Sequence, residues 1–228
     1  QGTRALINNL YGGTFTDAAH TMYTADSEEN IKAIQALVDS DAITFDASIA
    51  GGDEIRLFRQ GVLNVAFCWN IAQQLNADNN TAGLTNDGDE ILFMAFPSEN
   101  GTDTKLCGGI WGFGIFDNGD ANKIAASKLF IKYMADSAEG TKDAVLSSTY
   151  FPVRDTVEGV DLTGIYSDVQ AMSDYGTLMQ YLGDYYQVTP GWAEARTAWW
   201  NMLQQVGSGV DVETAVNEFV TTSNAAAK

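Results

Sequence analysis

Histidine, cysteine and proline are scarce in this chain of 228 residues, which contains one, two and three of them respectively. His20 is the sole histidine, which argues against zinc sites and against catalytic triads with a histidine base. Cys68 and Cys107 are not spaced as a CxxC metal or redox pair. Each adjoins the end of a predicted strand, so a disulfide between strands and two buried thiols are both open alternatives.

Positive charge is also scarce. The chain has 12 Lys and Arg against 30 Asp and Glu, which gives 12 − 30 = −18 and a sequence pI near 4.1. A surface this acidic repels phosphate backbones and anionic headgroups, which argues against nucleic-acid binding and direct electrostatic membrane binding. An affinity for cations is the functional alternative, although charge of one sign most often only solvates a surface.

Long apolar runs are missing, and none approaches the roughly 18 residues that a membrane-spanning helix needs. The first residues, QGTRALINNL, show no signal-peptide pattern, so we expect either a mature chain or one whose beginning has been removed. A hydrophobic content of 45% with 11% aromatics indicates a folded protein of one large domain or two lobes.

Helical periodicity is the strongest pattern present. In residues 26–41 Asp26 or Ser27 can cap a helix, Glu28 and Glu29 fall in its first turn, and apolar residues form one face. Further helices are predicted within residues 1–13, 51–61, 117–137, 137–147, 166–186, 189–209 and 211–228. For the helix in 117–137, the expected buried side consists of Ala125, Leu129, Phe130, Tyr133 and Met134.

Buried strands are predicted between these helices, at VLNVAFCW (62–69), ILFMAFP (91–97) and LCGGIWGFGIF (106–116). Helices alternating with short strands place the chain in the α/β class. The third stretch carries Gly108 and Gly109, and paired glycines let a backbone approach another body closely. It is either a strand that crosses beside a ligand or a core strand with bulges.

Two other kinds of site are rejected on spacing. The carboxylates Asp87, Asp89 and Glu90 do not match the spacing of an EF-hand, so we interpret residues 76–90 as a solvated loop rather than a calcium site. The glycines of GGIWGFG do not fit the GxGxxG pattern and do not lead from a strand into a phosphate-binding turn, which argues against a nucleotide site.

Several segments, taken in their order along the chain, resemble extracellular solute-binding proteins of sugar ABC transporters, the maltose-binding-protein-like group. They are SEENIKAIQALVDS, LFRQGVLNVAFCW, FMAFPSENGTDTKLCGGIWGFGI, ANKIAASKLFIKYMADSAEGTKDAV, FPVRD and VDVETAVNEF. The resemblance implies an α/β fold of the type II periplasmic-binding-protein kind. Residues 1–106 and 156–228 would form the C-terminal lobe, and 107–155 would cross into the N-terminal lobe. No segment matches the family's long N-terminal part, so we expect the C-terminal part of such a protein.

The resemblance also implies a ligand site. In the family, ligand contacts lie at the ends of helices and strands that face the cleft. The residues here that match such contacts are Trp69, Asn70, Gly109, Trp111, Trp192 and, more weakly, Tyr11. Flat aromatic rings with a few polar partners suit a pyranose, which has apolar faces and a polar rim. For each tryptophan, packing in the core is the alternative. Trp199 and Trp200 lie in the middle of a helix among apolar neighbours and are assigned to packing.

The function implied by the resemblance is non-catalytic binding of a sugar or oligosaccharide for delivery to the permease subunits of a bacterial ABC transporter. No cofactor, metal or catalytic residue is expected. The location would be extracellular, as a cell-surface lipoprotein whose anchor is not present in this chain, or periplasmic. Two alternatives stay open: a secreted glycoside hydrolase, which needs two carboxylates on opposite sides of a sugar, and a binding protein for polyamines or peptides, which fits the acidity.

Overall fold

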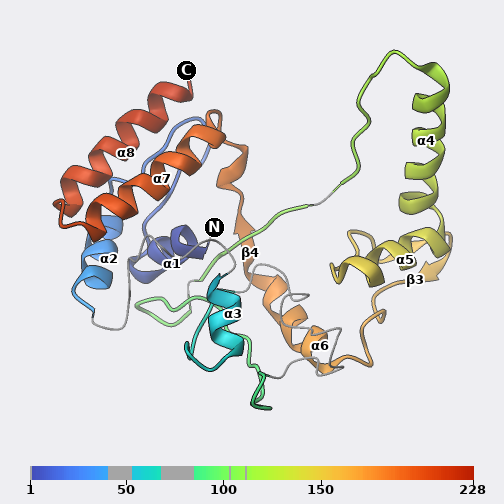
Figure 1. Ribbon diagram of the computed structural model, residues 1–228, viewed down its shortest axis with the longest axis horizontal. Coiled ribbons are helices and arrows are strands. Elements are labelled where there is room, and N and C mark those ends of the chain that lie inside the picture. The colour runs from blue at the N-terminus through green and yellow to red at the C-terminus, as the bar shows by residue number, and fades with distance from the viewer. Residues whose placement is uncertain (1, 41–52, 68–84, 103, 111) are drawn as a thin grey trace. The chain divides into compact units, whose positions relative to one another are not determined.

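The computed structural model describes residues 2–40, 53–67, 85–102, 104–110 and 112–228 (Figure 1). Contacts within the chain divide it into two compact units. The first unit comprises residues 1–53, 94–108 and 180–228, and the second comprises residues 54–93 and 109–179. The domain boundaries expected from the resemblance, after residues 106 and 155, stay a prediction.

The described chain is a mixed, helix-rich structure with a few short strands. The first unit holds α1 (Gly2–Tyr11), α2 (Glu28–Val38), β1 (Leu106–Cys107), β4 (Leu182–Asp184), the short 3-10 helix η3 (Tyr186–Val188), α7 (Trp192–Gly207) and α8 (Val212–Ala226). The second holds α4 (Ala121–Asp136), α5 (Ala138–Ser148), β2 (Thr156–Val157), β3 (Val160–Asp161) and α6 (Gln170–Gly176). The unit boundaries fall within α3 (Asp53–Arg59) and the 3-10 helix η2 (Thr177–Tyr181).

Local signals in the sequence correctly predicted these helices. Ser27 caps α2 by accepting a hydrogen bond from the backbone N–H of Asn30 at 3.3 Å, and Glu28 and Glu29 occupy the first turn. Ser137 caps α5 in the same way. Asp211 caps α8, and its hydrogen bonds with Thr214 hold the pKa of its carboxyl below the usual value. The cap and first-turn chemistry is local, which is why it can be read without knowing the fold.

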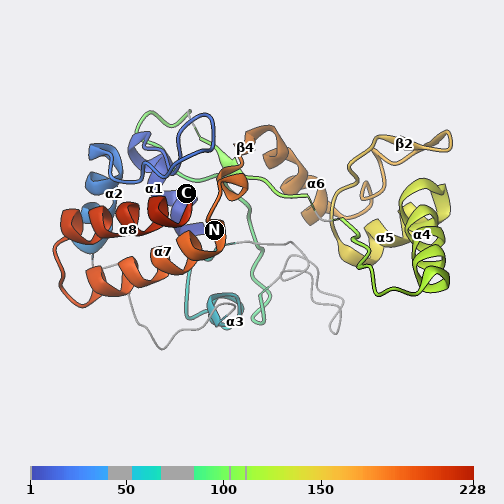
Figure 2. The same cartoon turned by 90° about the horizontal axis from the view of Figure 1, so that it is seen from above.

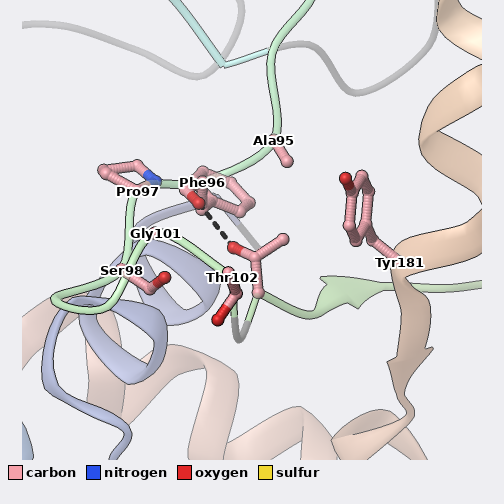
Figure 3. A pocket seen from close by; sticks show the side chains of 8 residues that line it. Ala95, Phe96, Pro97, Ser98, Gly101, Thr102 and Tyr181 are labelled. Carbon is pink, nitrogen blue, oxygen red and sulfur yellow. Dashed lines mark hydrogen bonds between the residues drawn. The ribbon is translucent and has the colours of Figure 1, made fainter.

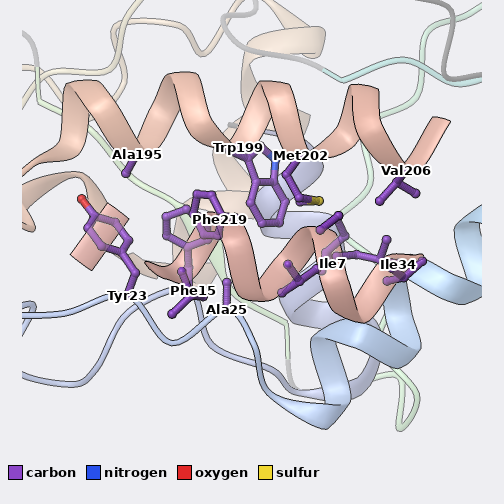
Figure 4. Packing of buried hydrophobic residues seen from close by; sticks show 14 of the residues in the cluster. Ile7, Phe15, Tyr23, Ala25, Ile34, Ala195, Trp199, Met202, Val206 and Phe219 are labelled. Carbon is purple, nitrogen blue, oxygen red and sulfur yellow. The ribbon is translucent and has the colours of Figure 1, made fainter. Parts of the chain in front are cut away.

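The core of the first unit is an aromatic cluster between α7, α8 and the loop that follows α1 (Figure 4). The helices α7 and α8 pack side by side in both views (Figures 1 and 2). The ring of Phe15 lies at the centre of the cluster, with its centroid 5.2 Å from that of Trp199 and 5.5 Å from that of Phe219. The indole Nε1–H of Trp199 donates to Thr3 Oγ1 at 3.1 Å, which links α7 to α1 and confirms the assignment of Trp199 to packing.

The second unit has a smaller core, formed by Val145, Tyr166 and Met172. The hydroxyl of Tyr166 donates to the carbonyl of Val145 at 2.6 Å and lies 2.9 Å from that of Tyr150. Burial raises the pKa of this phenol to about 12. Since Tyr166 follows the β2–β3 hairpin, these bonds tie the hairpin region to the end of α5.

The predicted strands are largely wrong. Among the described residues of the stretch 106–116, only Leu106 and Cys107 form a strand, which pairs in parallel with β4. No strand occurs at 91–97 or in the described part, 62–67, of the first predicted strand. Residues such as Val65 and Leu92 are exposed. Segments rich in aromatic and β-branched residues form a strand only where a neighbouring strand is present to pair with them. The local sequence does not show whether such a neighbour is present.

The expected buried side of α4 is also wrong, because this helix has no buried residue. Leu129 is 72% exposed and Phe130 is 56% exposed. The ring of Phe130 meets that of Phe113 at 6.0 Å in an edge-on contact, and Phe113 is itself exposed. The second unit therefore presents an apolar surface formed by α4 and residues 110–116, apart from residue 111, which lies outside the described residues.

Neighbouring tryptophans on α7 allow a matched test of the first core. Trp199 is 2% exposed and Trp200 is 49% exposed. We expect Trp199→Ala to lower the free energy of unfolding by about 3 to 5 kcal/mol, because it removes a fully buried ring from the aromatic cluster and leaves a cavity. Trp200→Ala should change it by less than about 1 kcal/mol. Urea denaturation followed by circular dichroism measures both, and equal losses would contradict this description of the core.

Candidate functional site

The residues predicted to bind ligand fall into two groups. Trp69, Asn70 and Trp111 lie outside the described residues, so these three assignments stay predictions. Cys68 also lies outside them, so a disulfide with Cys107 and two separate thiols both stay open. Tyr11, Gly109 and Trp192 are described, and their surroundings can be compared with the expected site.

Gly108 and Gly109 follow β1 and differ in their surroundings. A Cβ atom on Gly108 would lie 2.8 Å from Cε1 of Tyr185, so the close packing of this ring requires glycine. The carbonyl of Gly108 accepts a hydrogen bond from Gln187 Nε2 at 2.9 Å. A Cβ atom on Gly109 would meet nothing within 4 Å among the described residues. Gly108 is thus fixed by packing, whereas Gly109 is open.

Trp192 is the first residue of α7 and is half-buried. Gly191 caps the helix with φ +70, and a side chain there would collide with the backbone of Ala226 at 2.8 Å. The indole lies 5.5 Å from the ring of Tyr186 and 6.2 Å from the ring of Phe15, measured between centroids. The helix start and the two rings hold Trp192 in one orientation.

Arg4 is the residue that sequence reasoning missed. It projects from α1, is only 4% exposed, and places its guanidinium carbon 4.9 Å from the centroid of the Trp192 ring. The same carbon lies 5.7 Å from the centroids of Phe15 and Tyr186. A guanidinium over aromatic faces is attracted by their negative quadrupoles, so the three rings offset part of the cost of burying this cation.

Tyr186 completes the arrangement and is fully buried. Burial raises the pKa of its phenol far above the usual value, and the neighbouring Cys107 thiol adds to this effect, while Arg4 opposes it. The structure therefore brings Trp192 together with Arg4, Tyr186 and the end of β1. Each of these groups comes from a different segment of the first unit.

Tyr11, the weaker candidate, makes a different contact. Its ring lies 3.7 Å from Nζ of Lys32, which in turn lies 3.7 Å from Oε1 of Glu99 on an exposed part of the surface. A cation on the ring face is compatible with packing of α1 on α2, and it does not bring Tyr11 to Trp192.

A hollow of about 470 Å³ also occurs in the first unit (Figure 3). The rings of Phe96 and Tyr181 stand in its wall, and Ser98, Thr102 and Thr104 place hydroxyl groups along it. Thr104 Oγ1 donates to the carbonyl of Phe96, which fixes the loop. None of the described residues that line the hollow carries a carboxyl group. The sequence predicted a strand up to Pro97 followed by a loop, and it gave no indication of the hollow, because the lining combines residues 95–104 with the distant Tyr181.

Searches for other relationships and sites give negative results. Comparison of the chain with models of known protein families, with curated proteins and with solved structures finds no match. Across the described ranges no group of three or more His, Cys, Asp or Glu side chains could hold a metal ion. In the same ranges no helix is both long and apolar enough to cross a membrane.

The buried phenol of Tyr186 predicts how stability depends on alkaline pH. Its pKa in the folded protein lies above the ordinary value of 10.0, so the unfolded chain loses this proton first. The contribution of Tyr186 is fully present below pH 10 and is lost as the pH rises further, by about 1.4 kcal/mol per pH unit for one group. Tyr186→Phe should therefore reduce the loss of stability between pH 10 and pH 11.

Urea denaturation at pH 8, 10 and 11 measures this effect as a difference between pH values, so a constant effect of the lost hydroxyl cancels. Tyr166→Phe is the variant to compare with Tyr186→Phe, since it removes from the second unit another phenol whose pKa is raised by burial. Identical pH dependence for the unsubstituted protein and Tyr186→Phe would contradict the burial of this hydroxyl.

Proposed function

We propose that the chain is the substrate-binding component of an ABC transporter and binds a sugar or oligosaccharide without catalysis. The observation that carries this proposal is the half-buried indole of Trp192, which Arg4, Phe15 and Tyr186 hold in place at the start of α7. A pyranose stacks on a flat ring whose orientation is already fixed, because no ordering cost is then added on binding. Polar groups beside the ring supply hydrogen bonds to the rim of the sugar.

The proposal includes a type II periplasmic-binding-protein fold with the ligand in an aromatic-lined cleft between two lobes. Its support is the order of the family-like segments along the chain, with Trp69, Asn70, Gly109 and Trp111 as further contacts. The apolar surface of α4 and residues 110–116 supports a second part of the proposal. We propose that this surface is covered in a longer, two-lobed protein, which docks on membrane permease subunits as an extracellular lipoprotein or a periplasmic protein.

The first alternative is a glycoside hydrolase. Such an enzyme needs two carboxyl groups flanking the scissile bond, and the lining of the described hollow offers none. Incubation with xylan, cellulose and starch followed by a reducing-sugar assay distinguishes the two functions. Turnover that depends on a single carboxylate would favour the hydrolase and contradict non-catalytic binding.

The second alternative is a binding protein for polyamines or peptides, which is compatible with the net charge of −18. Here the ligand would be a cation, and Arg4 beside Trp192 would repel it. Calorimetry with spermidine, a basic peptide and a panel of neutral oligosaccharides separates this alternative from sugar binding.

The sugar-binding proposal makes a direct prediction. Trp192→Ala should weaken binding of the best oligosaccharide in the panel by about tenfold or more, because the stacking surface is lost. Trp69→Ala should have a similar effect. Trp200→Ala is the matched control, since this ring is half-exposed on the same helix and lies outside the proposed site. Titration calorimetry measures the affinities, and unchanged affinity in both site variants would contradict the assignment.

A further inference from the structure

Three buried polar atoms of α1 have no hydrogen-bond partner in the described structure. They are Nε of Arg4 and both side-chain amide atoms, Nδ2 and Oδ1, of Asn8. Arg4 is 4% exposed and Asn8 is 6% exposed. Positions four apart on a helix share one face, so these atoms belong to one stripe of α1. Leaving a buried polar atom without a hydrogen bond is costly, so such atoms call for a bonding partner.

The geometry of a guanidinium separates the two kinds of contact that Arg4 can make. Aromatic rings attract its flat faces, and the rings of Trp192, Tyr186 and Phe15 lie within cation–π distance. Its N–H groups point outward in the plane of the group. The edge formed by Nε and one terminal nitrogen matches the two oxygens of a carboxylate. The side chain of Tyr186 also takes part in a hydrogen bond with Arg4, so Nε–H is the donor of this guanidinium that is buried without a partner. A carboxylate oxygen is an acceptor that suits such a charged donor.

No carboxylate of the described chain forms an ion pair with Arg4. The described ion pairs join Lys32 with Glu99, Lys123 with Asp120, and Arg154 with Asp136. In a chain with 30 acidic residues, a buried arginine without an acidic partner has a charge that an external anion can balance. Asn8 adds one donor and one acceptor, which is the pairing that a sugar hydroxyl needs.

We propose that this face of α1 is a subsite for a carboxylate-bearing sugar, such as a uronic acid residue of an oligosaccharide. The carboxylate binds the Nε edge of Arg4, hydroxyl groups bond with the amide of Asn8, and the apolar part of the sugar contacts the indole of Trp192. This inference names the substrate class of the proposed sugar-binding function and rests on that function.

The net charge of −18 does not rule out an acidic ligand. At physiological ionic strength charges are screened over about 8 Å, so distant surface carboxylates act weakly on a bound anion. Charge-assisted hydrogen bonds in a partly dehydrated site are stronger than hydrogen bonds between neutral groups. The local cation therefore decides affinity, while the acidic surface mainly slows the approach of the ligand.

Each acidic sugar has a neutral counterpart of nearly the same shape, which gives a sharp test. Trisaccharides of galacturonate, glucuronate and mannuronate are titrated calorimetrically beside their methyl esters. We expect at least one acid to bind tenfold or more tightly than its ester. Arg4→Met should abolish this preference, and Arg4→Lys should weaken it, because lysine keeps the charge but lacks the planar edge.

Asn8→Leu provides a second variant, which should weaken binding of the acid and of its ester by similar factors. Near-ultraviolet circular dichroism establishes that each variant retains its aromatic packing, and Arg4→Lys keeps the test valid if Arg4→Met does not fold. Equal affinity for every acid and its ester, or a preference that survives in Arg4→Met, would overturn the inference while leaving sugar binding intact. Binding of neither acidic nor neutral sugars would overturn the proposed function itself.

Discussion

The first unit depends on the burial of one cation among aromatic rings. Arg4 comes from α1, Phe15 from the following loop, Tyr186 from η3 and Trp192 from the start of α7, and the guanidinium lies within 6 Å of all three ring centroids. Removing a charge from water is expensive, and the quadrupoles of the rings repay only part of that cost. The contact therefore requires accurate placement of four segments, and it links the helix at one end of the chain to those at the other.

The same cluster explains why Trp192 and Trp199 differ although both lie on α7. Trp199 faces α1 and α8, and its indole N–H donates a hydrogen bond to Thr3, so neighbouring side chains cover its ring. Trp192 lies in the first turn of α7, directly after the glycine cap, and is half-buried. A ring that is held but not covered suits stacking with a ligand, whereas a covered ring contributes to stability.

Predictions from the sequence succeeded for features that depend on neighbouring residues and failed for features that depend on distant parts of the chain. The caps Ser27 and Ser137 mark helix starts within three or four residues, so α2 and α5 were predicted. The amphipathic pattern of residues 211–228 predicted α8. The predicted strands failed at 62–67 and 91–97, because the local sequence does not show whether a neighbouring strand is present to pair with them. The predicted burial of α4 failed because periodicity shows that a face is apolar but does not show what covers it. Trp192 could be proposed from the resemblance to sugar-binding proteins, which place an aromatic ligand contact near this helix start. Arg4 could not, since an arginine in an amphipathic helix ordinarily faces water.

The distribution of charge has a consequence for specificity. If the ligand is acidic, the net charge of −18 slows its approach, so selectivity must come from slow dissociation rather than from fast association. A buried guanidinium meets that requirement because its hydrogen bonds to a carboxylate are shielded from water, whereas an exposed lysine would pair weakly and exchange quickly. Cations would be attracted to the acidic surface and then repelled at Arg4. Under the proposed function, the acidic surface and the buried Arg4 would thus act on different steps of binding, and Arg4 would determine which ligand stays bound.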